Sequence, residues 1–292
     1  MAVIMGLVLL SQSCDDGFMS SYRDELIVEG WIDDGGFPVV IVTHSLPVRS
    51  KEEAIKVSQI SQFMEMGAKV TVSDGDSSVI LTGKLDQGYY PPYIYTTSRL
   101  RGKAGKSYTL TVQTKDRFLT ANTTIPLNGP VVDSVVCRKM DGNDTLCFVI
   151  LYLKNVPDRR EYYKIFLQDG PALAQFHSSY LGVIDDAIAD SSMRIPLMRT
   201  VRDDFKEDKR RYFNTDSLLS IKVSTMDSVS YSFWKLFSNN TISSYFSFLM
   251  SSSTSNLPTN IDGGMGYWCG YNSYISTFTV TPGTLPGNYP LP

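Results

Sequence analysis

The chain has 292 residues, of which 42% are hydrophobic and 20% are charged, and this balance excludes a disordered protein. At about 150 residues per domain, the length predicts about two domains. The net charge is −3, so the chain lacks the strong basic field with which proteins bind nucleic acid. Only two histidines are present, which excludes most histidine-built metal sites. Aromatic residues make up 12%, a share more typical of strands than of helices.

The N-terminus carries an apolar run from Val3 to Leu10 that is followed by Ser-Gln-Ser and Cys14. As a helix this run would be about 12 Å long, and crossing a bilayer takes about 20 apolar residues. We therefore interpret residues 1–13 as a secretory signal peptide, although no Lys or Arg precedes the run. Its end, Leu-Ser-Gln-Ser-Cys, resembles a bacterial lipobox, so Cys14 is the predicted site of cleavage, acylation and membrane anchoring. A buried N-terminal strand is the alternative.

Two acidic residues, Asp15 and Asp16, follow the cysteine directly. Acidic residues at this place resemble the export signal of surface lipoproteins from Bacteroidota, and a solvated linker is the alternative. Residues 14–25 are polar and suit a tether that leads to a folded body. The expected location is therefore the cell envelope, at the outer membrane and on the cell surface.

Short strands separated by turns are predicted from residue 26 to residue 127. The segment 51–66 fits a helix only loosely, and both a short helix and a long loop remain open there. The β-branched and aromatic segments are 26–32, 39–43, 68–73, 78–82, 89–97, 105–114 and 118–125. Such strands, with Asp-Gly turns between several of them, indicate an N-terminal β-sandwich.

A second β-rich domain is predicted over residues 131–281, after a boundary at Leu127–Pro130. Asp227 is the expected N-cap of a short helix over 228–237 that covers one face of the sheet. The irregular stretch 169–214 is predicted to be a surface excursion, and 282–292 a loose tail. The strands of this domain are expected at 131–140, 145–154, 161–168, 218–225 and 274–281.

Two cysteines lie in the first hairpin of this second domain. If the hairpin centres near Gly142, Cys137 and Cys147 sit opposite each other, and a disulfide is geometrically allowed in an exported protein. Two small core thiols are the alternative, because a one-residue slip would turn the side chains to opposite faces. Cys269 remains unassigned.

The sequence contains no motif of a metalloprotease, a serine hydrolase, a phosphate-binding loop or a Cys-x-x-Cys redox site. We therefore expect a protein that is not an enzyme and that has no cofactor and no metal. His44 and His177 are not at ligand spacing and are interpreted as surface or edge residues. A remote alternative is a hydrolase that uses Asp185, Asp186 or Asp203.

An aromatic surplus and a glycine-rich stretch near the C-terminus form the candidate binding surface. Aromatic platforms bind sugars and partner proteins. The alternatives are a second core for the aromatic residues and close backbone approach for the glycines. The candidates are Tyr231, Trp234, Tyr245, Phe246, Phe248, Gly263, Gly264, Gly266, Tyr267 and Trp268.

Several of these segments occur in one order that resembles a known family. They are Cys14, Leu26–Ile32, Gly67–Gly75, Gly105–Val112 and the Asn-Ile-Asp-Gly-Gly-Met-Gly element at 260–266. The pattern resembles the Bacteroidota lipoproteins catalogued as domain of unknown function 4249. The resemblance implies an N-terminal immunoglobulin-like or transthyretin-like domain and a companion of TonB-dependent nutrient transporters, and it implies no catalytic residues.

We therefore expect a non-enzymatic outer-membrane lipoprotein that is held at the membrane through Cys14. It would bind a ligand, whose identity the sequence does not disclose, or serve a TonB-dependent transporter as an accessory partner. The alternative is a structural or adhesive subunit of a surface assembly.

Overall fold

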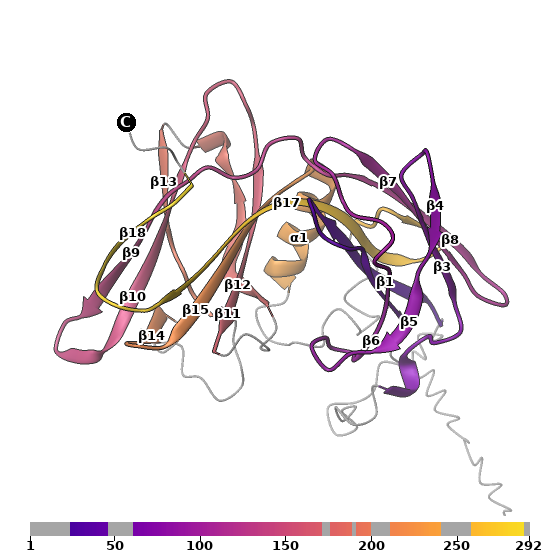
Figure 1. Cartoon of the computed structure of the whole chain (residues 1–292), viewed down its shortest axis with the longest axis horizontal. Helices are drawn as coiled ribbons and strands as arrows, with labels where there is room; N and C mark the ends of the chain where they lie inside the picture. Colours follow the sequence, from indigo (N-terminus) through magenta and orange to yellow (C-terminus); the bar gives the residue numbers. More distant parts are fainter. Residues whose placement is uncertain are drawn as a thin grey trace, which may run out of the picture.

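The computed structural model describes residues 24–45, 61–170, 176–188, 191–199, 211–240 and 258–288. The expected signal peptide, Cys14 and most of the tether lie outside the described residues. Within them the fold is mainly β, with a single α-helix, so the predicted fold class is confirmed. Two sandwiches stand side by side and share one long strand (Figure 1).

The first sandwich encloses a core between two sheets. Alternation within its strands produces this core: Tyr108, Leu110 and Val112 are buried, whereas the residues between them are less buried. One sheet contributes β1 (Leu26–Asp33), β2 (Val39–His44), β6 (Tyr93–Thr96) and β5 (Thr82–Leu85). The other has the order β16 (Ile261–Asp262), β8 (Phe118–Thr124), β7 (Ser107–Gln113), β3 (Lys69–Ser73) and β4 (Ser78–Ile80).

The second sandwich has its own core, in which Leu151, Ile165 and Val223 are fully buried. One layer is formed by β12 (His177–Asp185), β11 (Tyr162–Asp169) and β15 (Leu218–Met226). The other layer has the order β13 (Ser192–Pro196), β10 (Asn143–Lys154), β9 (Val132–Met140) and β18 (Gly283–Pro286), and β14 (Tyr212–Asn214) also pairs with β10.

The long strand β17 (Met265–Thr279) joins the two sandwiches. Its first half pairs in parallel with β1, and its second half, from Asn272 onward, pairs antiparallel with β15. The result is one eight-stranded sheet, β12-β11-β15-β17-β1-β2-β6-β5, that runs through both sandwiches. Ile261 and Trp268 thus pack in the first core, although the sequence grouped them with residues 131–281.

Helix α1 (Ser228–Asn240) begins at the predicted N-cap: the backbone N–H of Ser230 donates to Asp227 Oδ1 at 2.7 Å. It packs on β11, β12 and β17, beside the junction of the sandwiches (Figure 1). We call the face of the eight-stranded sheet that carries α1 the helix-side face. Trp31 lies on it and contacts both the cluster under α1 and a smaller apolar cluster around Val39 and Ile94.

Three segments differ from the expectation. The stretch 169–214 contains β12, β13 and β14 as well as the 3-10 helix η3 (Asp186–Ile188), residues 283–286 form β18, and the last long strand begins at Met265 instead of Tyr274. The beginning of β17 shows no alternation of apolar and polar residues because both of its faces are buried. Trp268 faces the first core, whereas Tyr267 and Cys269 face α1.

Cys137 and Cys147 are free, buried thiols. Cys137 pairs with Val149 and Cys147 pairs with Lys139, because an irregularity between Asn143 and Cys147 shifts the register of the hairpin. The two cysteines are therefore not directly opposite each other, and the structure shows the alternative of two core thiols.

Candidate functional site

Three aromatic residues of the predicted binding surface, Trp234, Tyr267 and Trp268, lie in buried cores instead of on a surface. At most 7% of Trp234, Tyr267 and Trp268 is exposed. The Nε1–H of Trp234 donates to the hydroxyl of Tyr271 at 2.9 Å, and that of Trp268 donates to the carbonyl of Tyr108 at 3.0 Å. Tyr231 is half-buried on α1 and stacks on Tyr162.

The three glycines of this prediction allow close backbone approach. A Cβ at Gly263 would lie 2.6 Å from the carbonyl oxygen of Phe118, and one at Gly266 would overlap the carbonyl of Val28. Gly266 also has φ +111°, a conformation that favours glycine. A Cβ at Gly264 would lie 2.9 Å from the carbonyl oxygen of Leu26 and would overlap the side chain of Leu119. The remaining candidates, Tyr245, Phe246 and Phe248, lie outside the described residues.

The carboxylates of the remote hydrolase hypothesis have partners within the fold. Asp185 accepts two bonds from the guanidinium of Arg160, at 3.1 and 2.7 Å, and this contact lowers the pKa of Asp185. Asp186 accepts the backbone N–H of Glu161 at 2.9 Å, and burial raises its pKa. Asp203 lies outside the described residues.

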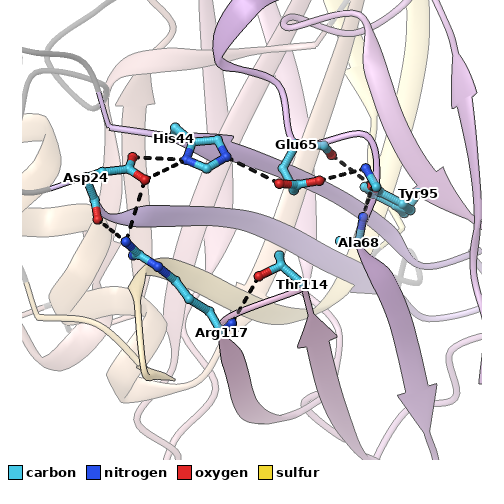
Figure 2. A network of polar contacts seen from close by, with 8 residues as sticks. Asp24, His44, Glu65, Ala68, Tyr95, Thr114 and Arg117 are labelled. Atoms are coloured by element: carbon cyan, nitrogen blue, oxygen red, sulfur yellow. Dashed lines mark hydrogen bonds and ion pairs between the residues drawn. The ribbon is translucent and has the colours of Figure 1, made fainter.

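His44 lies in a polar network at the start of β1, where the chain enters the first sandwich (Figure 2). Its Nδ1 is 2.9 Å from Asp24 Oδ1, and its Nε2 is 3.3 Å from Glu65 Oε2. Arg117 donates to the carbonyl of Asp24. Because both ring nitrogens face carboxylates, neither is placed to take a proton from a hydroxyl or a thiol. His177 is exposed on β12.

A cleft of about 840 Å³ opens on the helix-side face, near the edge strand β5. Residues of β1, β2, β4, β5 and β6 line it, together with the segments 36–37, 86–89 and 97–99. Residues that alternate away from the first core supply its floor, among them Trp31, Val39 and Ile94. The volume lies within the usual range of small-molecule sites.

Aromatic side chains give the cleft its apolar surface. The rings of Trp31 and Tyr89 are 6.0 Å apart between centroids and are tilted by 38°. The guanidinium of Arg101 covers the ring of Phe37 at 4.1 Å and donates to the carbonyl of Gly35. Burial raises the pKa of the Tyr89 hydroxyl, so this group is a neutral hydrogen-bond donor at physiological pH.

The two carboxylates of the cleft already have cationic partners. Asp33 accepts from Lys222 Nζ at 2.7 Å and from the Ser273 hydroxyl at 2.6 Å. Asp86 accepts from Lys84 Nζ at 3.0 Å, a contact that lowers the pKa of Asp86.

Three hydrogen-bond donors of the cleft have no acceptor within the described residues. Among the described residues, nothing is hydrogen-bonded to the indole N–H of Trp31, the hydroxyl of Tyr89 or the exposed guanidinium of Arg99. The cleft thus combines stacking surfaces with donors that point to no acceptor within the described fold.

Comparison with protein families matches residues 17–275 to the family described as Domain of unknown function (DUF4249). The chain belongs to this family. None of the curated proteins matches the sequence. The predicted family is therefore confirmed, and it spans both sandwiches.

Within the described part of this family member, no group of three or more His, Cys, Asp and Glu side chains is arranged to hold a metal. No helix in that part combines the length and the apolar character needed to span a bilayer.

The sequence did not single out the residues of the cleft. Trp31 and Asp33 were parts of one predicted strand, and Tyr89 was part of another. The available signal was that Trp31 and Asp33 share a face of β1 opposite to Ile32. That signal could not show which residues of β5 and β6 lie on the same face.

Proposed function

We propose that this protein is a non-enzymatic outer-membrane lipoprotein, anchored on the cell surface through acylated Cys14, that binds through the cleft beside Trp31. The cleft is the observation that carries the proposal. Its occupant would be a nutrient ligand or a segment of a TonB-dependent transporter, for which the protein would be an accessory partner. The resemblance of the sequence to envelope lipoproteins supports the transporter as the partner.

The chemistry of the cleft supports binding. Ligand sites combine apolar and aromatic walls with a few polar groups that fix orientation. Here Trp31, Phe37 and Tyr89 supply the walls, and the unused donors supply the orientation. The carboxylates of Asp185 and Asp186 and the ring of His44 are bound to other groups of the fold, which supports the non-enzymatic part of the proposal.

Anchoring is tested by the variant Cys14→Ala, followed by membrane fractionation. We expect this variant to lose its acyl chains and to leave the membrane fraction, because those chains supply the anchoring energy. Ser21→Ala, in the tether, is the control and should remain with the membranes. Equal membrane retention of all three proteins would refute the lipoprotein part.

Binding through the cleft is tested by filling it. Thr82 is exposed and lines the cleft, so Thr82→Tyr places a ring inside it without touching a core. Thr284 is exposed on β18 of the other sandwich, and Thr284→Tyr is the matched control. In mild detergent extracts, the wild type and Thr284→Tyr should retain a transporter or ligand that Thr82→Tyr loses. If both variants retain the transporter or ligand equally, the cleft is not the binding site.

A structural or adhesive subunit is the second candidate, and the edge of β5 is the observation that favours it. In the described part of the sheet β5 pairs only with β6, while Leu85 of β5 and Ile80 of β4 are 68% and 58% exposed. Such an edge can pair with a second copy. Sedimentation of the Cys14→Ala protein tests this: assembly that grows with concentration and disappears in Leu85→Lys supports it, and a strict monomer contradicts it.

A further inference from the structure

The charges of the cleft leave one side chain without a counterion. Lys222 neutralises Asp33 at 2.7 Å, and Lys84 neutralises Asp86 at 3.0 Å. Arg99 is exposed at the rim, and no carboxylate in the described residues pairs with its guanidinium. Among the described residues that line the cleft, Arg99 is therefore the cation without a carboxylate partner, and its planar fork matches a carboxylate.

The aromatic side chains of the cleft set a second requirement for the chemistry of the ligand. Trp31 and Tyr89 line the same cleft with ring centroids 6.0 Å apart, and rings or flat apolar faces stack on aromatic side chains. The unused indole N–H of Trp31 and the neutral hydroxyl of Tyr89 suit hydroxyl or carboxyl oxygens at the edge of a bound ring. Thr82 and Ser98 add two exposed hydroxyls at the rim.

We infer that the cleft binds a ring-bearing carboxylate, with the ring on Trp31 and Tyr89 and the carboxylate on Arg99. This inference rests on the proposed function, because it assumes that the cleft is the binding site, and it adds the chemical class of the ligand. A neutral ring would leave Arg99 unpaired, and a cation would be repelled by it.

Two sources supply this chemistry, namely acidic sugars and aromatic acids. We would titrate the detergent-solubilised full chain with galacturonate, its short oligomers and indole-3-acetate, and with galactose as the neutral control. Saturation-transfer NMR detects weak binding of all four probes. The acidic probe with the higher affinity identifies the source.

The variant Arg99→Gln removes the guanidinium from an exposed position, so folding is not at risk. Arg138→Gln, at an exposed arginine on β9 of the other sandwich, produces the same change in net charge and is the control. We expect Arg99→Gln to weaken binding of the acidic probe at least tenfold and to leave galactose unaffected. Arg138→Gln should bind like the wild type, and Thr82→Tyr should bind no probe.

The outcomes separate this inference from the proposed function. One outcome overturns the ligand class and leaves the cleft as the binding site. In it, galactose binds as tightly as galacturonate, and binding is lost in Thr82→Tyr but not in Arg99→Gln. Equal binding by wild type, Thr82→Tyr and Arg99→Gln overturns both. If no probe binds, the ligand class is wrong, and the retention experiment on Thr82→Tyr still decides the proposed function.

Discussion

Position 266 lies where the backbone of β17 leaves no space for a Cβ beside β1. Gly266 has φ +111°, and a Cβ there would overlap the carbonyl of Val28. We expect Gly266→Ala to lower the free energy of unfolding by about 3 kcal/mol or more, because backbone strain and steric overlap add. Urea denaturation measures the loss.

Gly75→Ala is the matched control for this substitution. Gly75 has φ +89° in an exposed turn, and a Cβ there would meet nothing within 4 Å. It should cost about 1 kcal/mol, from backbone strain alone. Equal losses in the two variants would show that the approach of the strands does not matter.

Lys164 gives the protein a pH-dependent stability. Its side chain is 1% exposed, its Nζ lies 4.2 Å from the ring centroid of Trp234, and it donates to the hydroxyl of Ser178. Burial lowers the pKa of Lys164 to about 7. In the unfolded chain a lysine keeps its proton up to about pH 10.4.

Between these two pKa values the unfolded state binds more protons than the folded state, so the contribution of Lys164 to stability rises with pH. We expect the unfolding free energy of wild type minus that of Lys164→Met to increase from pH 7 to pH 10, by at most about 1.4 kcal/mol per pH unit. Lys115→Met, at an exposed turn, controls for the loss of a lysine. A difference that stays flat over this range would contradict a lowered pKa.

Helix α1 carries side chains that pack on Tyr267 and Tyr271, so the stability of this cluster depends on the helix and on its N-cap. Asp227 Oδ1 accepts the backbone N–H of Ser230, which has no partner inside the helix. We expect Asp227→Ala to cost about 1 kcal/mol and Asp227→Asn to cost clearly less, since Asn also caps helices. Thermal unfolding followed by circular dichroism measures the loss of stability in both variants. Equal losses would show that the charge of Asp227, and not its hydrogen bond, stabilises the helix.

How far each element was predictable depended on its burial. Strands with one buried face, such as Ser107–Gln113, have a period of two that is visible in the sequence, and β7 was predicted within two residues at its start and one at its end. The first half of β17 was not predicted, because Trp268 faces one core while Tyr267 and Cys269 face another. Without alternation, its glycines resembled a loop.

The cleft could not be predicted for a related reason. Trp31, Tyr89 and Arg99 belong to separate segments, and they meet only because β2 pairs with both β1 and β6. A local pattern shows which face of a strand is apolar but not which strand lies next to it. The capped helix was predicted, since an N-cap and a helical stripe are local signals.

At the scale of the whole molecule, two segments of the described part of the chain connect the sandwiches. The chain passes from the first to the second through residues 125–131, and β17 runs from the first core to the second again. Asn272 on β17 donates to the carbonyls of Pro126 and Leu127, so the two connections also contact each other.

Cutting the first connection should therefore leave the sandwiches together. We expect a protein with a protease site inserted between Gly129 and Pro130 to run as one particle in gel filtration after cleavage. In denaturant the two fragments should separate, which controls for complete cleavage. Separation under native conditions would show that the pairing of β1 with β17 is too weak to hold the halves.

The pairing of β1 with β17 also sets an order in time. Ile27 lies opposite Met265, so β1 meets its parallel neighbour only after the long segment between them, residues 34–264, has been synthesised. Until then β1 has a hydrogen-bonding edge open beside a core that lacks Trp268. A nascent chain is thus exposed to wrong partners while residues 34–264 are synthesised, and the first sandwich is completed only after most of the second has been made.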